Sequence, residues 1–414
     1  MTRQDIIRTA LRVWGRELYQ RTSLGDLARE LGVSKAALYR HFTGKEELVK
    51  AVDEYFCDDY ASFLKPRFDA ALKVPDKKES ILLIIRGIIE YYIRNRDLFV
   101  FSLIQVYRNW EEQRIAEQMG RRGIDIEKLK LLGEDGNVEP SLRLLLVTSL
   151  IFRIAHFHKH ECREDAALSE GQIGKAAAEV EERLNSGLAL EKSRIGALEY
   201  ERLEALAAGS SHTKSAVDEN DGLLRAVGIV VAEAGPWNAS MEMVARRSGL
   251  SKSSLYAHFR NKRDMLRRLF VTEFDRIILL ARKNIRLSAV PEEQLYLGIF
   301  SVVSYLRSRP EILVAMNWVR TRRPNLGRPA KQDRFRVFEG IAIEALRNDG
   351  NGHWIFFLIL GMMTKWSKEN NGPGFLERSS PGGGGAEGCF PDLPNGSIRR
   401  LYRFICLGFR GFEG

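Results

Sequence analysis

Two basic side chains and a phenol lie close together near the N-terminus: Lys35, Tyr39 and Arg40, separated by short side chains that include Ala36 and Ala37. Lysine and arginine attract phosphate groups, and arginine can donate two parallel hydrogen bonds to a guanine edge. The residue types in this segment therefore predict a surface that binds a polyanion through charge and hydrogen bonds.

The flanking residues predict a helix-turn-helix that holds this surface outward. Gly32 can take the positive φ that ends one helix and opens a short turn. Ser34 occupies the position of an N-cap. Leu38 and Phe42 recur four residues apart on one helical face, so they should point inward. An exposed, basic second helix is the expected shape for binding in the DNA major groove.

Two capping patterns frame this helix pair. Ser23 and Asp26 are expected to cap the helix before the turn. Thr43 and Glu46 have the spacing of a capping box at the start of the following helix.

The same pattern returns from Val244 to Leu266, 217 residues after it begins at Leu27, and it aligns without a gap. The residues that repeat are Ala245, Arg246, Gly249, Ser251, Lys252, Leu255, Tyr256, His258, Phe259 and Lys262, matching Ala28, Arg29, Gly32, Ser34, Lys35, Leu38, Tyr39, His41, Phe42 and Lys45. Here the cap is expected one residue later, with Asn261 as N-cap and Asp264 at the third helical position. Chance does not produce this register, so the chain contains an internal repeat.

The repeated pattern G-[VL]-S-K-x-x-L-Y-x-H-F-x-x-K resembles the DNA-binding end of the tetracycline-repressor (TetR) family of bacterial transcriptional regulators. The resemblance implies an all-α fold with two helix-turn-helix heads, each followed by a helical-bundle regulatory body. We divide the chain accordingly into a first head (1–48), a first body (49–188), a helical and flexible linker (189–217), a second head (218–266) and a second body (267–414).

The resemblance also implies which residues contact DNA. The implied base contacts are Lys35, Ala36, Ala37 and Arg40 in the first head and Lys252, Ser253, Ser254 and Ala257 in the second. The implied backbone contacts are Ser23, Ser34, Tyr39, His41, Lys45, Ser240, Ser251, Tyr256, His258 and Lys262. Since Ala257 offers a methyl group where Arg40 offers a guanidinium, the two heads are predicted to prefer different half-sites.

Apolar residues recur at helical spacing through both bodies, without a convincing strand pattern. The long helix after the first head should end at Pro66 or Pro75. Family members usually bind a small, often apolar effector in the body. Aromatic residues that could line such a pocket, or simply fill the helical cores, are Tyr91, Tyr92, Phe99, Tyr107, Trp110, Tyr296, Phe300, Tyr305 and Trp318.

The ends of the two bodies also correspond, with Gly408 in the place of Gly187. In the family, the last two helices of each body form a four-helix bundle with those of a partner subunit. Ala189 to Ala208 is expected to form one charged helix, followed by a flexible segment that leads to the second head. Such a linker would let the two halves of one chain pair as a pseudo-dimer, with heads about one helical turn of DNA apart.

Composition agrees with a nucleic-acid partner and with a reducing compartment. The net charge is +10, and residues 1–50 hold ten Lys or Arg against six Asp or Glu. The four cysteines lack metal-type spacing and a secretory context, and the apolar runs are too short to span a membrane. We expect a cytoplasmic, nucleoid-associated bacterial protein that uses no cofactor and no metal.

The resulting hypothesis is a transcriptional repressor that binds an imperfect palindrome in double-stranded DNA and is released by a small-molecule effector. The sequence shows no pairing of a nucleophile with a base that would indicate an enzyme. The alternative is a protein-interaction scaffold in which one or both heads no longer bind DNA. The sequence also allows two chains to form a homodimer, which would carry four heads.

Overall fold

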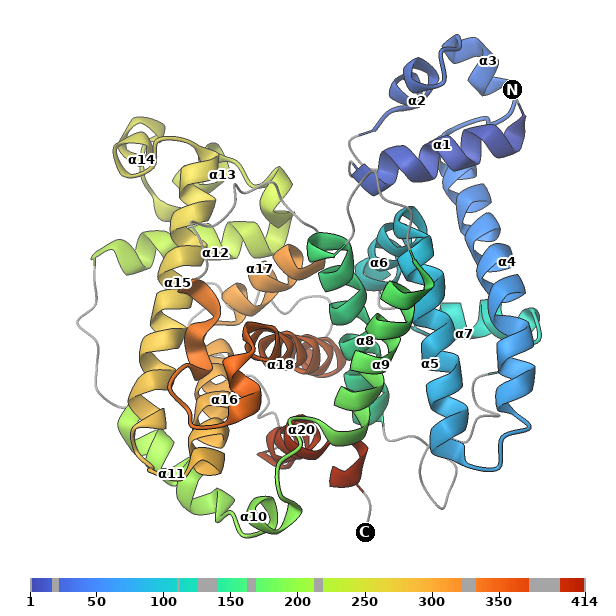
Figure 1. Ribbon diagram of the computed structural model, residues 1–414. Helices are drawn as coiled ribbons and strands as arrows, with labels where there is room; N and C mark the ends of the chain where they lie inside the picture. The colour runs from blue at the N-terminus through green and yellow to red at the C-terminus, as the bar shows by residue number, and fades with distance from the viewer. Residues whose placement is uncertain are drawn as a thin grey trace. The chain divides into compact units, whose positions relative to one another are not determined.

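The computed structural model describes residues 2–16, 22–109, 112–125, 140–161, 169–211, 219–321, 333–371 and 395–412 (Figure 1). Within these ranges the regular structure is helical and contains no strand, which confirms the predicted all-α class. No helix in these ranges is long and apolar enough to cross a membrane. The chain divides into two compact units, Met1–Arg143 with Leu150–Glu181, and Leu144–Ser149 with Glu182–Gly414. The finer division into heads, bodies and linker stays a prediction.

The first unit is built from nine described helices. They are α1 (Arg3–Arg16), α2 (Leu24–Glu30), α3 (Lys35–Tyr39), α4 (Lys45–Ala71), α5 (Lys77–Arg94), α6 (Arg96–Asn109), α7 (Glu112–Arg121), most of α8 (Pro140–His160) and most of α9 (Glu170–Ser186). Of the two prolines predicted to mark the end of α4, Pro66 was the wrong one, because it lies inside the helix; Pro75 follows the last helical residue, Ala71, by four positions. Leu64 and Phe68 are buried on either side of Pro66, so packing sustains the helix despite one missing N–H donor.

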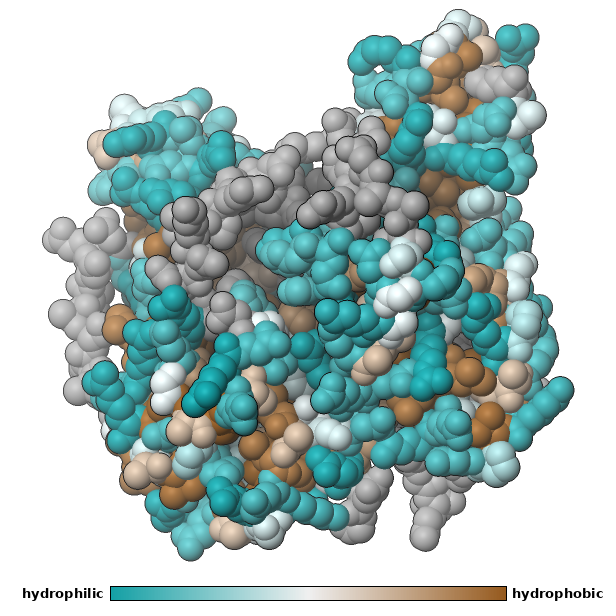
Figure 2. Space-filling view, in the orientation of Figure 1, coloured by the Kyte–Doolittle hydropathy of each residue, from teal (hydrophilic) through white to brown (hydrophobic). Residues whose placement is uncertain are grey.

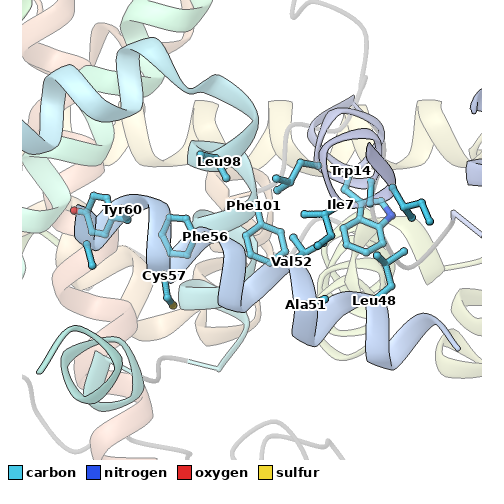
Figure 3. Close-up of a cluster of buried hydrophobic side chains, with 14 of the residues drawn as sticks. Ile7, Trp14, Leu48, Ala51, Val52, Phe56, Cys57, Tyr60, Leu98 and Phe101 are labelled. Carbon is cyan, nitrogen blue, oxygen red and sulfur yellow. The ribbon is translucent and has the colours of Figure 1, made fainter. Parts of the chain in front are cut away.

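A continuous apolar cluster joins α1 and α6 to the long helix α4 (Figure 3). Trp14 of α1 and Val52 of α4 are buried at the end near the helix-turn-helix, and Phe56 and Tyr60 continue the cluster along α4. The edge of the Phe101 ring on α6 packs against Phe56, with ring centroids 6.1 Å apart. The first head and its body therefore share one core.

The second unit repeats this plan with the helices that follow α9. They are α10 (Lys192–Gly196), α11 (Tyr200–Ser211), α12 (Glu219–Asn238), α13 (Met241–Ser248), α14 (Lys252–His258), α15 (Lys262–Ile285), α16 (Pro291–Ser308), α17 (Pro310–Thr321), the 3₁₀ helices η2 (Asp333–Phe338) and η3 (Glu344–Arg347), α18 (Asp349–Asn371), α20 (Asn395–Leu407) and η4 (Gly408–Gly411). Just as α1 packs on α6 and α4 on α5, α12 packs on α17 and α15 on α16.

The expected single helix over 189–208 was wrong, because the chain forms two separate helices, α10 and α11. The physical reason is that α11 packs on α15 and α16 of the second unit. Glu204 of α11 accepts hydrogen bonds from the Tyr296 hydroxyl (2.6 Å) and from the Arg399 guanidinium (2.9 and 3.0 Å). Leu203 beside it is fully buried. The segment is therefore part of the second unit's fold, and residues 212–218 lie outside the described ranges.

The end of α9 and the end of α20 cross at two glycines. Gly187 and Gly408 both have positive φ, +57° and +59°. A Cβ on Gly187 would collide with the Ile405 carbonyl oxygen, and one on Gly408 would collide with the Leu184 carbonyl oxygen. This close approach lets the Leu188 amide donate to the Ile405 carbonyl at 2.8 Å. The two chain segments whose endings correspond in sequence are thus in direct backbone contact.

The Glu204 cluster predicts a loss of stability for Glu204→Gln. Burial acts to raise the pKa of Glu204, but hydrogen bonds from Arg399, Tyr296 and Asn395 outweigh it and hold that pKa below its ordinary value. The carboxylate therefore stabilises the fold above the ordinary glutamate pKa, and this contribution is lost as the pH falls through the folded value. In urea unfolding at pH 7, the variant should lose about 1–3 kcal/mol.

Glu201→Gln is the matched control for this prediction. Glu201 also pairs with Arg399, at 2.7 Å, but its side chain is 78% exposed. Solvent screens such a pair, so this variant should lose much less stability than Glu204→Gln. Equal losses in the two variants would show that Glu204 does not anchor α11.

The glycine crossing predicts that Gly187→Ala is strongly destabilising. The new Cβ meets backbone atoms and the positive φ disfavours alanine, so the cost should be about 2–4 kcal/mol in urea unfolding. Gly174→Ala, inside α9 and with open space at its Cβ position, should instead stabilise by about 0.5–1 kcal/mol. A neutral Gly187→Ala would contradict the crossing.

Candidate nucleic-acid interface

The turn between the second and third helices of each head has the same backbone geometry. Gly32 has φ +66° and Gly249 has φ +69°. The Val33 amide donates to the Ala28 carbonyl at 2.9 Å, and the equivalent Leu250 amide donates to Ala245 at 3.0 Å. The positive φ predicted for Gly32 is confirmed and Gly249 repeats it, and each turn closes its helix through the same backbone hydrogen bond.

Serines cap the helices on both sides of each turn. Ser34 Oγ accepts from the Ala37 amide at 3.2 Å, and Ser251 Oγ accepts from the Ser254 amide at 3.0 Å. Ser23 forms the predicted capping box with Asp26 at the start of α2. Ser240 caps α13 in the same place. Both heads therefore have the same two serine caps, one on the helix before the turn and one on the helix after it.

Burial of one helical face leaves the opposite face of α3 and α14 in solvent. Leu38 and Phe42 are 0% and 1% exposed, and Leu255 and Phe259 are 0% and 3% exposed. Among the residues predicted to contact DNA, those that are exposed are Ser23, Ser34, Lys35, Ala36, Tyr39, Arg40, Ser251, Lys252, Ser253, Tyr256, Ala257 and His258. Those that are half-buried are Ala37, His41, Lys45, Ser240, Ser254 and Lys262.

The surface over α13 and α14 is largely hydrophilic on the face seen in Figure 2. In the first head, the Lys35 ammonium lies 5.9 Å from the centre of the Tyr39 ring, one helical turn away. Lys45 lies at the start of α4, where burial lowers its pKa and the nearby Asp26 carboxylate opposes that effect. Each head thus presents a polar, basic surface on a short, capped helix.

The start of the long helix corrects one prediction. The N-cap of α4 is Gly44 rather than Thr43, and the Thr43 amide and hydroxyl donate to Glu47 at 2.7 and 2.8 Å. Glu47 rather than Glu46 makes this contact, because the helix begins one residue later than expected.

In the second head the predicted cap is confirmed. Asn261 Oδ1 accepts from the Asp264 amide at 2.9 Å, and the Arg260 amide donates to Asp264 at 3.2 Å. Arg260 and Asp264 match Thr43 and Glu47 in the repeat. The cap therefore has not moved between the heads.

Arg3 contributes to the packing of the first head, and the sequence did not predict this role. Its guanidinium donates to the His41 carbonyl at 3.0 Å, pairs with Glu47 at 3.2 Å and lies 4.3 Å from the centre of the Phe42 ring. Arg3 therefore joins the start of α1 to the segment between α3 and α4. No local pattern could have indicated this contact, because the two partners are 38 residues apart.

The predicted effector-pocket residues lie in packed regions. In the first unit Tyr91, Tyr92 and Phe99 belong to one aromatic cluster, with ring centroids 5.3 and 5.5 Å apart. In the second unit Tyr296 contacts Glu204 and Tyr305 contacts Glu273, while Phe300 is 8% exposed. The side chains of the remaining predicted residues, Tyr107, Trp110 and Trp318, lie outside the described ones.

A hollow of about 360 Å³ lies elsewhere in the first unit, between α5 and α9. Charged side chains from both helices line it, including Arg86, Glu90 and Glu170.

Comparison with known proteins matches the two heads. A family model described as "Bacterial regulatory proteins, tetR family" matches residues 6–52 and again residues 229–269, which include every residue predicted to contact DNA. The chain is 35% identical over 54 residues to the uncharacterized HTH-type transcriptional regulator YerO of Bacillus subtilis (strain 168). It is 40% identical over 53 residues to the HTH-type transcriptional regulator AcrR of Shigella flexneri.

These alignments cover 13% of this chain, and 19% and 25% of the two relatives. A similar solved structure is that of a TetR family transcriptional regulator, PfmR, from Thermus thermophilus. That match has 24% identity and a TM-score of 0.31, and it covers 43% of this chain and 95% of the other.

Proposed function

We propose that this chain, whose two heads belong to the tetR family of bacterial regulatory proteins, is a sequence-specific DNA-binding transcriptional regulator. The observation that carries the proposal is the pair of exposed, serine-capped helices α3 and α14, each presenting a lysine and a tyrosine one turn apart. Their inward faces are buried, so the outward faces are available to enter a major groove. Lys35 and Lys252 begin these faces.

We also propose that one chain acts as a pseudo-dimer on an imperfect palindrome. Two heads in one chain supply the two reading helices for which a single-headed protein needs a partner. The backbone contact between the ends of α9 and α20 supports this arrangement, because these segments close the two sequence repeats. Fused heads can differ from each other, so the two half-sites need not match.

The remaining parts of the proposal concern regulation and place. Repression, release by a small apolar effector and action on cytoplasmic, nucleoid DNA are what a family member of this kind would do. Release by an effector rests on the family resemblance alone, because Tyr91, Tyr92 and Phe99 pack against one another and do not line the hollow between α5 and α9.

The direct test is selection of bound duplexes from a random DNA pool by the purified chain. Enrichment of two unequal half-sites supports the proposal, and one half-site alone assigns DNA binding to one head. No enrichment at low salt overturns it in favour of a protein-interaction scaffold. Six to ten phosphate contacts also predict a loss of roughly 10³- to 10⁵-fold in affinity between 50 and 200 mM salt.

The difference between Arg40 and Ala257 gives a sharper prediction. Arg40→Ala should weaken binding to the first half-site by about 1–3 kcal/mol and relax its base preference at one position, because a bidentate guanine contact is lost. The measurement is competition binding with duplexes altered at single positions in either half-site.

The control is Lys50→Ala, which removes an exposed positive charge on α4, just after the first head and outside the predicted contact residues. It should leave base preference unchanged. If Arg40→Ala weakens all sequences equally, Arg40 contacts only phosphate and the predicted half-site difference is wrong.

A further inference from the structure

Six charged side chains of the second unit form a cluster where α12, the first helix of the second head, meets its body. We call this set the ion cluster: Asp221, Arg225, Glu273, Arg276, Arg309 and Glu311. Three carboxylates face three guanidinium groups, so the charges balance.

Glu273 of α15 lies at the centre of the cluster and is fully buried. It accepts hydrogen bonds from the Tyr305 hydroxyl at 2.5 Å, from Arg309 at 3.0 Å and from Arg276 at 3.3 Å. A buried carboxylate needs such partners, since an unpaired charge in the interior is very costly. These contacts therefore fix how α15 packs against the turn between α16 and α17.

Two residues of α12 join the head to this centre. Asp221 accepts from Arg276 at 2.6 Å and from Arg309 at 3.2 Å. Arg225 lies 3.8 Å from Glu311, which in turn accepts from Arg309 at 2.8 Å. Arg309 thus contacts α12, α15 and α17 at once.

The α12–α17 packing leaves little room for movement at this point. A Cβ on Gly228 of α12 would lie 3.0 Å from Ile312 and 3.1 Å from Glu311. The helices approach closely because position 228 is glycine.

The first unit builds the same junction differently. At the repeat offset of 217, Phe56 stands in place of Glu273. At an offset of 214, Asn95 is the C-cap of α5 as Arg309 is the C-cap of α16. Asn95 and Arg309 have matching backbone angles, with φ −121° and −132° and ψ 66° and 67°. Phe56 packs on Tyr60 with ring centroids 5.5 Å apart, in the cluster of Figure 3. Aromatic packing therefore occupies the position that the ion cluster occupies in the second unit.

We propose that the ion cluster positions the second head for DNA binding, so that Glu273 and Arg309 determine affinity for the second half-site only. The inference rests on the proposed DNA-binding function. Glu273 and Arg309 are positioning residues, because they act through α12 and do not themselves lie on α14. The two junctions thus differ at their centres, which are an aromatic ring at Phe56 in the first unit and a buried carboxylate at Glu273 in the second.

The test compares Glu273→Gln with Glu204→Gln, two buried glutamates of the same unit, on duplexes with either half-site scrambled. Glu273→Gln should weaken binding to the second half-site by about 3- to 30-fold and leave the first half-site unchanged. Glu204→Gln should leave both half-sites unchanged when compared at equal fractions of folded protein. Arg309→Gln should act like Glu273→Gln, and the double variant should lose less than the sum.

Equal effects of Glu273→Gln and Glu204→Gln on the second half-site, or equal loss at both half-sites, would overturn the proposal. Hydrogen exchange of the DNA-free chain separates this outcome from a failure of the proposed function. Exchange in residues 219–238 should rise in Glu273→Gln and stay unchanged in Glu204→Gln. Unchanged exchange there in both variants overturns the inference, whether or not the chain binds DNA.

Discussion

A helix of five to seven residues does not hold its shape alone in water, so α3 and α14 depend on burying one leucine each. Leu38 and Leu255 are fully buried, and Phe42 and Phe259 bury the next turn of the same faces. This burial fixes the rotation of each helix about its axis and leaves the lysine and tyrosine side chains in solvent. The glycine turn and serine cap then fix where the helix begins.

Below the heads the two halves diverge, although their helices pack in the same pairs. The first junction is a cluster of rings around Phe56 and Tyr60, and the second is a set of buried ion pairs around Glu273. Apolar packing tolerates small shifts of shape, whereas a buried charge is stable only with its partners in place. Two repeats within one chain can diverge in this way, because a change in one repeat need not appear in the other.

Local signals predicted the heads well and predicted long-range features poorly. Gly32, Ser34 and the Leu38–Phe42 spacing act within a few residues, and the structure confirms each of them. The cap of α4 was misplaced because Glu46 and Glu47 are both acidic, and only the helix start decides which one reaches Thr43. Features that depend on distant partners carried no such signal. The break between α10 and α11 follows from the hydrogen bonds of Glu204 with Tyr296 and Arg399, which are distant in the sequence. The contrast between the two head–body junctions could not be predicted, because in the sequence Glu273 resembles any solvated helix residue.

The most direct test of the account is a hydroxyl-radical footprint of the chain on its selected duplex. Two protected tracts about one helical turn apart, roughly 10–10.5 base pairs, are predicted, with one chain bound per duplex. A single protected tract, or two tracts that require two bound chains, would contradict DNA binding by both heads of one molecule.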